Sequence, residues 1–249
     1  MQGSQRQLHG LRAGLATGMV LAALLPAPPA AAEPPHVAES VQLSNERTFT
    51  RWAYSTDIQP VREQPKPNAW QVGKVSLNTE DGLREVYTLL SSWTDPTGAD
   101  WLRIRIPMRP KPRVGWVDAS ALGEAHLVTT RLVVDRRRLR ATLYRAGRRV
   151  WRSRIGVGKA GTPTPRGRFW IRERLRPKSP RGPYGPWAFG TSAYSRLSDW
   201  PGGGVVGIHG TDQPELIPGR PSHGCIRVPN RAIRRLARLM PIGTPILIR

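Results

Sequence analysis

Short runs in which apolar and polar side chains alternate, separated by turn residues, constrain the fold of this chain more than any other feature. Residues 102–106 alternate leucine and isoleucine with arginine, and residues 139–144 and 151–157 repeat the pattern. Residues 169–172 set Phe and Ile against Trp and Arg. Successive side chains of a strand point to opposite faces, so a period of two buries one set and leaves the other in water. The pattern predicts a mostly β chain of half-buried antiparallel strands with arginine on the wet face.

One segment near the end of the sequence has the period of a helix instead. Asn230 is suited to cap its N-terminus. The apolar residues that share one face of this helix are Ile233, Leu236, Ala237 and Met240. Pro241 and Gly243 end the helix, and residues 244–248 give a last strand.

The strand-like runs fall into two groups, which we interpret as two domains. Residues 45–125 hold short β-rich runs and a hairpin-turn signal at Asp81-Gly82. This part resembles the small SH3-like β-barrels of bacterial exported enzymes, mainly through Gly115-Trp116-Val117 before a short final turn. An unspecific small β domain is the alternative. Residues 33–44, rich in proline and alanine, are predicted to be a linker before it, and residues 126–249 to be the second domain.

The N-terminus has the pattern of an export signal. Arg6 and Arg12 precede an apolar stretch over residues 13–25, and Ala30-Ala31-Ala32 fits the small-residue rule for cleavage. The stretch is short for a membrane span of about 20 residues. We therefore predict a signal peptide over residues 1–32 and an exported protein, periplasmic or wall-associated, with no stable membrane span after cleavage. Retention as an uncleaved anchor is the alternative.

Charge divides the sequence unevenly. The formal net charge is +22, and 34 of the 39 basic residues are arginine. Residues 126–249 hold 26 basic and 5 acidic side chains, whereas residues 33–125 are close to neutral, at −1. The positive electrostatic potential of residues 126–249 attracts polyanions. Together with an export signal it favours anionic cell-wall polymers over nucleic acid as partners, although an arginine bias in coding would give the same composition.

Reactive side chains concentrate around the single cysteine. One cysteine excludes an intrachain disulfide, and two of the five histidines, His209 and His223, lie within 17 residues of Cys225. A thiol attacks carbonyls as thiolate, so it needs a base or positive surroundings that depress its pKa. If residues 222–225 are extended, His223 lies beside Cys225 rather than facing it. The base is therefore expected from an adjacent strand that carries His209, and Gly224 leaves room for backbone N–H groups to form an oxyanion hole.

Two other roles are open to the same residues. His209, His223 and Cys225 could ligate zinc with an open fourth position. Their spacing matches no known zinc motif, however, and no nearby acidic residue is placed to orient the imidazoles. A purely structural role would leave a thiol and two imidazoles clustered in a region rich in glycine and proline. We therefore expect a cysteine nucleophile that uses no metal and no cofactor.

Two motifs in the basic half are similar to those of a known family. Residues 155–169, IGVGKAGTPTPRGRF, look like the signature loop of the L,D-transpeptidase catalytic domain of the YkuD type. His209-Gly210, followed by residues 222–228, SHGCIRV, matches the active-site motif of that family in order and approximate spacing. The resemblance covers about residues 126–249. It implies an antiparallel β-sandwich or barrel-like catalytic domain with one C-terminal helix.

The resemblance also implies roles for the residues of the second motif. Cys225 is the nucleophile and His209 is the proton donor and acceptor. Ser222, His223 and the backbone around Gly224 support the thiolate and the oxyanion. By the same resemblance, carbapenem β-lactams form a stable adduct at the cysteine.

Two further positions of the motif bear on substrate and base. By the same resemblance, Arg227 is placed to face a carboxylate of the peptidoglycan stem peptide. Some family members have serine after the first histidine, where this chain has Gly210, so a backbone carbonyl must orient His209 if it is oriented there.

The expected reaction is acyl transfer between peptidoglycan stem peptides. The thiolate attacks the carbonyl before the terminal D-residue of a tetrapeptide, and an amine of a second stem resolves the thioester. Two rival functions are open. With water as acceptor the same site is a carboxypeptidase. Without catalysis, the SH3-like part and the basic residues would make a wall-binding protein, which has no need for Cys225.

Overall fold

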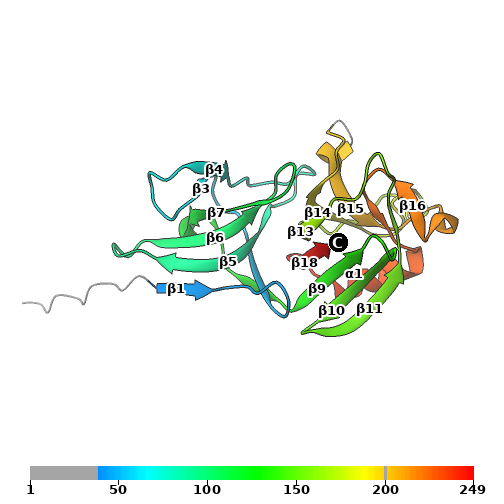
Figure 1. Ribbon diagram of the computed structural model, residues 1–249, viewed down its shortest axis with the longest axis horizontal. Coiled ribbons are helices and arrows are strands. Elements are labelled where there is room, and N and C mark those ends of the chain that lie inside the picture. The colour runs from blue at the N-terminus through cyan, green and yellow to red at the C-terminus, as the bar shows by residue number, and fades with distance from the viewer. Residues whose placement is uncertain (1–38, 199–200) are drawn as a thin grey trace, which may run out of the picture. The chain divides into compact units, whose positions relative to one another are not determined.

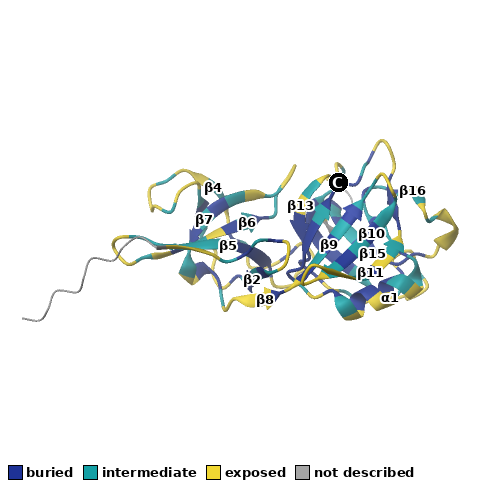
Figure 2. Cartoon of the chain, turned by 60° about the horizontal axis from the view of Figure 1, so that its bottom comes forward, coloured by how far each residue is buried: buried dark blue, intermediate teal, exposed yellow. Residues whose placement is uncertain are grey.

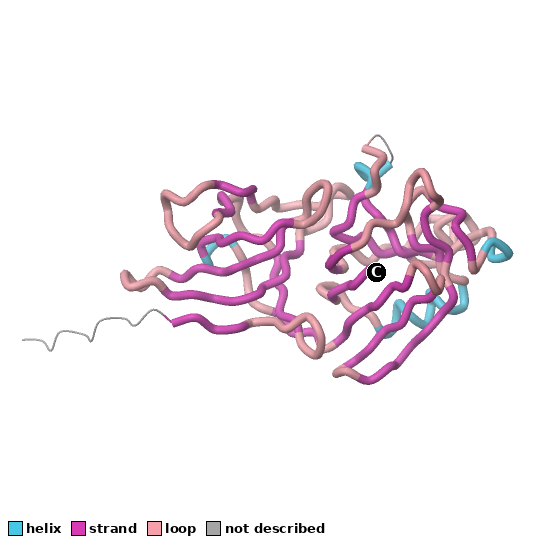
Figure 3. Tube along the Cα trace, viewed as in Figure 1, coloured by secondary structure: helices cyan, strands magenta, loops and turns pink. Residues whose placement is uncertain are grey.

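The computed structural model describes residues 39–198 and 201–249, all of which belong to one compact unit of the chain. Strands dominate this structure, and the helical segments are few and short (Figure 3). The expectation of a mostly β chain is therefore confirmed. The predicted signal peptide, residues 1–32, and the first part of the predicted linker lie outside the described residues.

Residues 39–128 form one sheet of eight strands (Figure 1). The strands are β1 (Glu39–Gln42), β2 (Thr50–Tyr54), β3 (Pro60–Arg62), β4 (Gln71–Lys74), β5 (Val86–Thr94), β6 (Asp100–Ile106), β7 (Arg113–Asp118) and β8 (His126–Val128). They follow the order β4-β3-β7-β6-β5-β2-β8, and β1 also pairs with β5. A short 3-10 helix, η1 (Ala119–Ala121), follows β7. Strand β1 lies inside the stretch predicted to be a linker, so regular structure begins earlier than the composition indicated.

Residues 130–248 form two sheets of five strands each. Their strands are β9 (Thr130–Asp135), β10 (Arg140–Arg145), β11 (Arg148–Arg154), β12 (Gly156–Gly158), β13 (Gly167–Trp170), β14 (Ala188–Tyr194), β15 (Val205–His209), β16 (Gly219–Ser222), β17 (Ile226–Arg227) and β18 (Pro245–Ile248). The orders are β11-β10-β9-β18-β13 and β14-β15-β17-β12-β16. Short 3-10 helices η2 (Pro201–Gly204) and η3 (Pro214–Leu216) lie between strands.

Most strand pairs in these two sheets are antiparallel, as predicted. Three pairs are parallel: β9 with β18, β12 with β16, and β15 with β17. Parallel partners need long connections, so an alternation read along neighbouring segments does not reveal them.

The two sheets share one hydrophobic core. Alternate residues of β9, β10 and β15 enter it, and Figure 2 shows buried and part-exposed positions alternating along these strands. The helix α1 (Asn230–Leu239) adds the apolar face predicted for it, since Ile233, Leu236 and Ala237 are buried in the same core. This core fixes the strands that carry the candidate site.

The start of α1 differs from its prediction. Pro229, not Asn230, occupies the N-cap position, and no side chain caps the helix. The Asn230 amide instead bonds to the backbone of Thr211, with Oδ1 accepting from N–H and Nδ2 donating to the carbonyl, both at 2.9 Å. Asn230 therefore holds the loop that follows β15.

Two tight turns are seen in the structure, of which the second, at Asp81-Gly82, was predicted and is confirmed. Arg145 and Arg148 pair at the end of β10 and β11, and Ala146 and Gly147 between them both have positive φ, as a two-residue hairpin loop requires. At Asp81-Gly82 the Thr79 N–H donates to the Leu83 carbonyl at 2.7 Å. The second turn carries Asp81 to the cavity described below.

One face that the alternation assigned to water is buried. Trp170 is 0% exposed and Arg172 is 3% exposed. Trp170 Nε1 donates to the Val86 carbonyl at 2.7 Å, and Arg172 Nε donates to Glu85 Oε1 at 2.7 Å. Arg172 also pairs with Glu80, at 2.9 Å. The prediction was wrong because residues of the first sheet cover this face, and they lie far away in the sequence.

Candidate active site

Strand β15 presents alternate residues to a cavity. Val206 and Ile208 are buried in the core, whereas Val205, Gly207 and His209 line the cavity. This division follows from the alternation of side chains along a strand. The prediction that a strand carries His209 is confirmed, and Gly207 leaves the wall open at the position two residues before it.

Cys225 lies between β16 and β17, in a segment that is not extended. Gly224 has a φ of +132°, a conformation that glycine adopts far more readily than other residues. A Cβ at Gly224 would also lie 3.2 Å from Ser195 Oγ. The alternation expected for an extended segment therefore fails here. His223 is not among the residues that line the cavity, whereas Cys225 is.

Four side-chain hydrogen bonds fix this segment. Ser222 Oγ donates to the Cys225 carbonyl at 2.6 Å and accepts from the Gly224 N–H at 3.2 Å. Thr164 Oγ1 donates to the Gly224 carbonyl at 2.7 Å, and Ser195 Oγ donates to the His223 carbonyl at 2.7 Å. Because Ser222 engages the Gly224 N–H, that donor is not free in this structure to serve an oxyanion.

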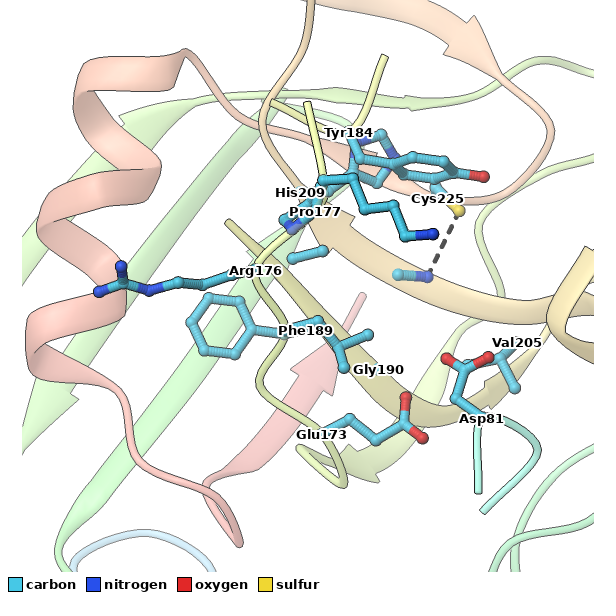
Figure 4. Close-up of a pocket in the computed structure, with 14 residues that line it drawn as sticks. Asp81, Glu173, Arg176, Pro177, Tyr184, Phe189, Gly190, Val205, His209 and Cys225 are labelled. Carbon is cyan, nitrogen blue, oxygen red and sulfur yellow. Dashed lines mark hydrogen bonds between the residues drawn. The ribbon is translucent and has the colours of Figure 1, made fainter. Parts of the chain in front are cut away.

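The thiol and the imidazole face the same small space. The Gly207 N–H donates to Cys225 Sγ at 3.3 Å. A Cβ placed on Gly207 would lie 3.6 Å from His209 Cδ2 and 3.8 Å from Cys225 Sγ. Figure 4 shows His209 and Cys225 at one end of the cavity, close to the ring of Tyr184. A substrate group bound in the cavity next to the Cα atom of Gly207 would therefore contact both the thiol of Cys225 and the imidazole of His209.

A backbone carbonyl orients His209. The carbonyl oxygen of Gly210 lies 2.6 Å from His209 Nδ1 and accepts its proton, which leaves Nε2 as the basic nitrogen. Burial lowers the pKa of His209 to about 4, and the nearby charge of Arg227 acts in the same direction. The imidazole is therefore neutral at physiological pH and able to accept a proton.

The thiol is not ionised in the resting site. Burial raises the pKa of Cys225 above its ordinary value, and the Gly207 N–H and the charge of Arg227 only partly oppose this. The prediction of a depressed thiol pKa is wrong for the protein without substrate. The resting pair is a neutral thiol beside a neutral imidazole, so the proton must move when the substrate is attacked.

Arg227 acts on the site through its charge. Its Nη1 donates to Gln213 Oε1 at 2.9 Å, and it does not line the cavity. In the parallel pairing of β15 and β17 it is the register partner of His209. Its predicted contact with a substrate carboxylate stays a prediction.

Comparison with known proteins identifies the family of the part of the chain that carries Cys225 and His209. Residues 129–248 match the family model of the L,D-transpeptidase catalytic domain, YkuD. The YkuD protein of Bacillus licheniformis is 39% identical over 106 residues, and that of Bacillus subtilis is 38% identical over 94 residues. Residues 129–248 are an L,D-transpeptidase catalytic domain. The alignments cover 43% and 38% of this chain, and the chain spans 57% and 50% of the lengths of these two relatives.

Two solved structures are also similar to part of this chain. The catalytic domain of the E. faecium L,D-transpeptidase, solved by NMR, is 29% identical, with a TM-score of 0.36. That match covers 48% of this chain and 96% of the other. Bd1075 of Bdellovibrio bacteriovorus is 28% identical with a TM-score of 0.39, over 49% of this chain and 48% of the other.

The L,D-transpeptidase domain of this chain cannot carry serine after the first histidine. A Cβ at Gly210 would lie 2.9 Å from Gly185 Cα and from Pro186 Cδ, and it would overlap Asn230 Oδ1. The position therefore supplies only its backbone carbonyl to His209.

The L,D-transpeptidase cavity also contains residues that the sequence did not indicate as site residues. Its volume is about 420 Å³. Besides Cys225 and His209 its walls consist of Asp81, Glu173, Leu175, Arg176, Pro177, Lys178, Tyr184, Ala188, Phe189, Gly190, Val205 and Gly207. Tyr184 packs edge-on against His209 with ring centroids 5.0 Å apart. Apart from Cys225 and His209, none of these residues lies within the two motifs. Of the residues that hold the cysteine segment, Thr164 and Ser222 lie within the motifs and Ser195 does not.

Residues 39–198 and 201–249 show neither a candidate metal cluster nor a candidate membrane-spanning helix. No group of three or more His, Cys, Asp or Glu side chains there is arranged to hold a metal ion. No helix in the same part of the chain is long and apolar enough to cross a membrane.

The raised thiol pKa leads to a prediction about alkylation. We expect the rate at which iodoacetamide modifies Cys225 to keep rising past pH 9, because only the thiolate reacts. Arg227→Gln should slow the reaction at each pH, since removing the cation raises the thiol pKa further. Stopped-time labelling followed by intact mass measures both rates. A plateau reached by pH 7 would show a thiolate already present in the resting site.

Proposed function

We propose that this protein is a peptidoglycan L,D-transpeptidase in which Cys225 is the nucleophile and His209 the general base and acid. The observation that supports this most strongly is the shared space above Gly207, which the thiol and the imidazole both border. The family of residues 129–248 supports activity on peptidoglycan. The apolar cavity wall supports a site from which water is displaced when a peptide binds.

The first step forms a thioester. As Sγ attacks the carbonyl carbon before the terminal D-residue of a tetrapeptide, the thiol proton passes to His209 Nε2. The tetrahedral intermediate then collapses, and the C–N bond breaks. The leaving amine takes the proton from Nε2, which restores the neutral imidazole. The product is an acyl group on Cys225 and a free D-amino acid.

The second step transfers this acyl group. A neutral amine of a second stem attacks the thioester, and His209 Nε2 accepts a proton from the attacking nitrogen. Collapse of the intermediate expels sulfur, which regains the proton from the imidazole. Water in place of the amine gives the carboxypeptidase reaction with the same movements of protons.

Backbone donors would stabilise the charges that develop. The Gly207 N–H already contacts sulfur, so it is placed to stabilise the thiolate as it forms. The backbone around Gly224 remains our candidate for the oxyanion, with Ser222 and His223 as the residues that shape it. Donation from the Gly224 N–H requires its bond to Ser222 Oγ to be exchanged for the substrate.

Product analysis tests this function. Purified protein is incubated with a tetrapeptide donor and a second stem that offers an amine, and the products are identified by mass. A cross-linked peptide with loss of one D-residue supports the transpeptidase. A tripeptide alone identifies the carboxypeptidase. Neither product, with binding of walls retained, would favour the wall-binding alternative.

We further propose an exported, wall-associated protein that binds anionic wall polymers. Five arginines line a recess of about 150 Å³. The recess is formed mainly by residues of β9, β10 and β11 and by the residue that follows β18. The five arginines are Arg138, Arg140, Arg149, Arg152 and Arg249. The single acid of the recess, Asp135, lies 3.4 Å from Arg249 Nη2. Guanidinium groups pair with phosphate and carboxylate through two donors at once, which suits such polymers.

The charge of this recess predicts salt-dependent wall binding. Co-sedimentation of the full chain with purified walls should fall steeply as salt rises, because screening acts over about 8 Å near physiological salt. Replacing Arg149 and Arg152 by glutamine should weaken it several-fold. Replacing Lys111 and Arg113 instead removes the same charge from the start of β7 and the loop before it, and should change little. Binding that follows the second pair would assign the anchor to residues 39–128, the part predicted to be SH3-like.

A further inference from the structure

The cavity that holds Cys225 has an acidic end that the acyl-transfer steps do not use. Glu173 and Asp81 both line it, and Figure 4 shows their carboxylates near each other, away from the sulfur atom. Asp81 comes from the turn after β4, and Glu173 follows β13. Two carboxyl groups brought together from distant parts of the sequence form an acidic point in a largely apolar cavity.

Glu173 is buried and lacks a full set of partners. Its residue is 4% exposed, and Oε1 has no hydrogen-bond partner. Among the described residues, no ion pair includes Glu173 or Asp81, because the nearby Arg172 is bound to Glu80 and Glu85. A buried carboxylate without a cation is costly, so such a group points to a ligand that supplies the charge.

Facing glycines connect this acid to the thiol. Gly190 of β14 is the register partner of Gly207 of β15. A Cβ on Gly190 would overlap Glu173 Oε2, and a Cβ on Gly207 would lie 3.8 Å from Cys225 Sγ. Facing residues of an antiparallel pair are about 5 Å apart, which places carboxylate and sulfur on the order of 10 Å from each other. The two glycines leave an open path between them.

We propose that Glu173 and Asp81 form a cation subsite that binds the terminal ammonium group of the substrate residue whose carbonyl is attacked by Cys225. A side chain with a four-carbon stem and an ammonium group can reach from one end of this path toward the other. The inference rests on the proposed function, because it identifies the chemistry of the acyl donor. It makes Glu173 and Asp81 residues that determine substrate specificity.

Binding to a protein that cannot react tests the proposal directly. Two N-acetylated tetrapeptides are used that end in D-alanine and differ only in the third residue, lysine or norleucine. In the Cys225→Ala protein we expect the lysine peptide to bind on the order of 10- to 100-fold more tightly, as a charged hydrogen bond would allow. Adding Glu173→Gln should remove this difference, whereas adding Glu124→Gln, an exposed acid elsewhere, should preserve it. Asp81→Asn, at an exposed position, provides a second variant in case Glu173→Gln does not fold.

The pH dependence separates recognition from a structural role. Burial raises the pKa of Glu173 to about 7, and the charge of Asp81 adds to this while Arg172 opposes it. Arg176 and Lys178 also line the cavity as cations, and His209 titrates three units lower. The preference for lysine should therefore grow between pH 6 and 8, as Glu173 ionises, and it should be flat in Glu173→Gln.

Three results would overturn the proposal. They are equal affinity of the Cys225→Ala protein for both peptides, a lysine preference that survives both Glu173→Gln and Asp81→Asn, and a preference that does not change with pH. Failure of the proposed function is seen separately, as absence of turnover of either peptide by the unmodified protein. The binding measurement remains decisive in that case because it needs no reaction.

Discussion

Replacing Cys225 by alanine is expected to abolish acyl transfer, with a loss on the order of 10⁶-fold or a rate below detection. No other thiol exists in the chain, so no side chain can take over formation of the thioester. Loss of a catalytic nucleophile in a comparable acyl-transfer enzyme has an effect of this size. The rate is measured from the release of the terminal D-residue by mass.

The same variant should fold normally. Cys225 is half-buried, and alanine removes one atom, which leaves little cavity. The loop is held by bonds from Ser222, Thr164 and Ser195, none of which requires sulfur. A thermal midpoint close to that of the unmodified protein is the control. Normal turnover by a folded Cys225→Ala protein would end the assignment of the nucleophile.

Replacing His209 by alanine should lower the rate of acylation by about 10²- to 10⁴-fold while affinity for substrate changes little. The reason is that a neutral thiol cannot lose its proton without the imidazole. His126→Ala, an exposed histidine outside the cavity, is the matched control and should keep full activity. If His223→Ala proves more damaging than His209→Ala in single-turnover acylation, the two histidines have been assigned in reverse.

The pH profile provides a second readout for His209. Because burial lowers the pKa of His209 to about 4, acidification removes the base only near that pH. The acylation rate with the norleucine peptide, which avoids the acidic end of the cavity, should therefore be flat from pH 6 to pH 8 and fall below pH 5. A decline centred between pH 6 and 7 would mean that an imidazole other than the buried His209 acts as the base.

The parts of this protein that follow local rules could be predicted from its sequence. Alternation identified β6, β10 and β11, and the apolar face of α1 was correct because helical periodicity depends only on neighbouring residues. The candidate catalytic pair could be proposed because Cys225 is unique and His209 belongs to a motif of fixed order.

Features that depend on distant residues could not be predicted. The alternation pattern assigns Arg172 to the solvent-facing side of its strand. In the structure it bonds to Glu85, which lies 87 positions earlier in the sequence. The local sequence predicts that Asn230 caps the helix, whereas in the structure its side-chain amide bonds to the backbone of Thr211. The thiol pKa was misjudged because the sequence shows the positive neighbour Arg227 but not the burial that outweighs it. Asp81 enters the cavity only because the first sheet and the catalytic strands share one unit of structure.

The most direct test of the central claim is the mass of the protein during a single turnover. The unmodified protein is mixed with a tetrapeptide donor in the absence of an acceptor amine, quenched in acid and measured intact. The account predicts a mass increase equal to the tripeptide acyl group, located on the peptide that contains Cys225 and absent from Cys225→Ala. Release of the D-residue with no covalent intermediate on Cys225, or an adduct on another residue, would contradict it.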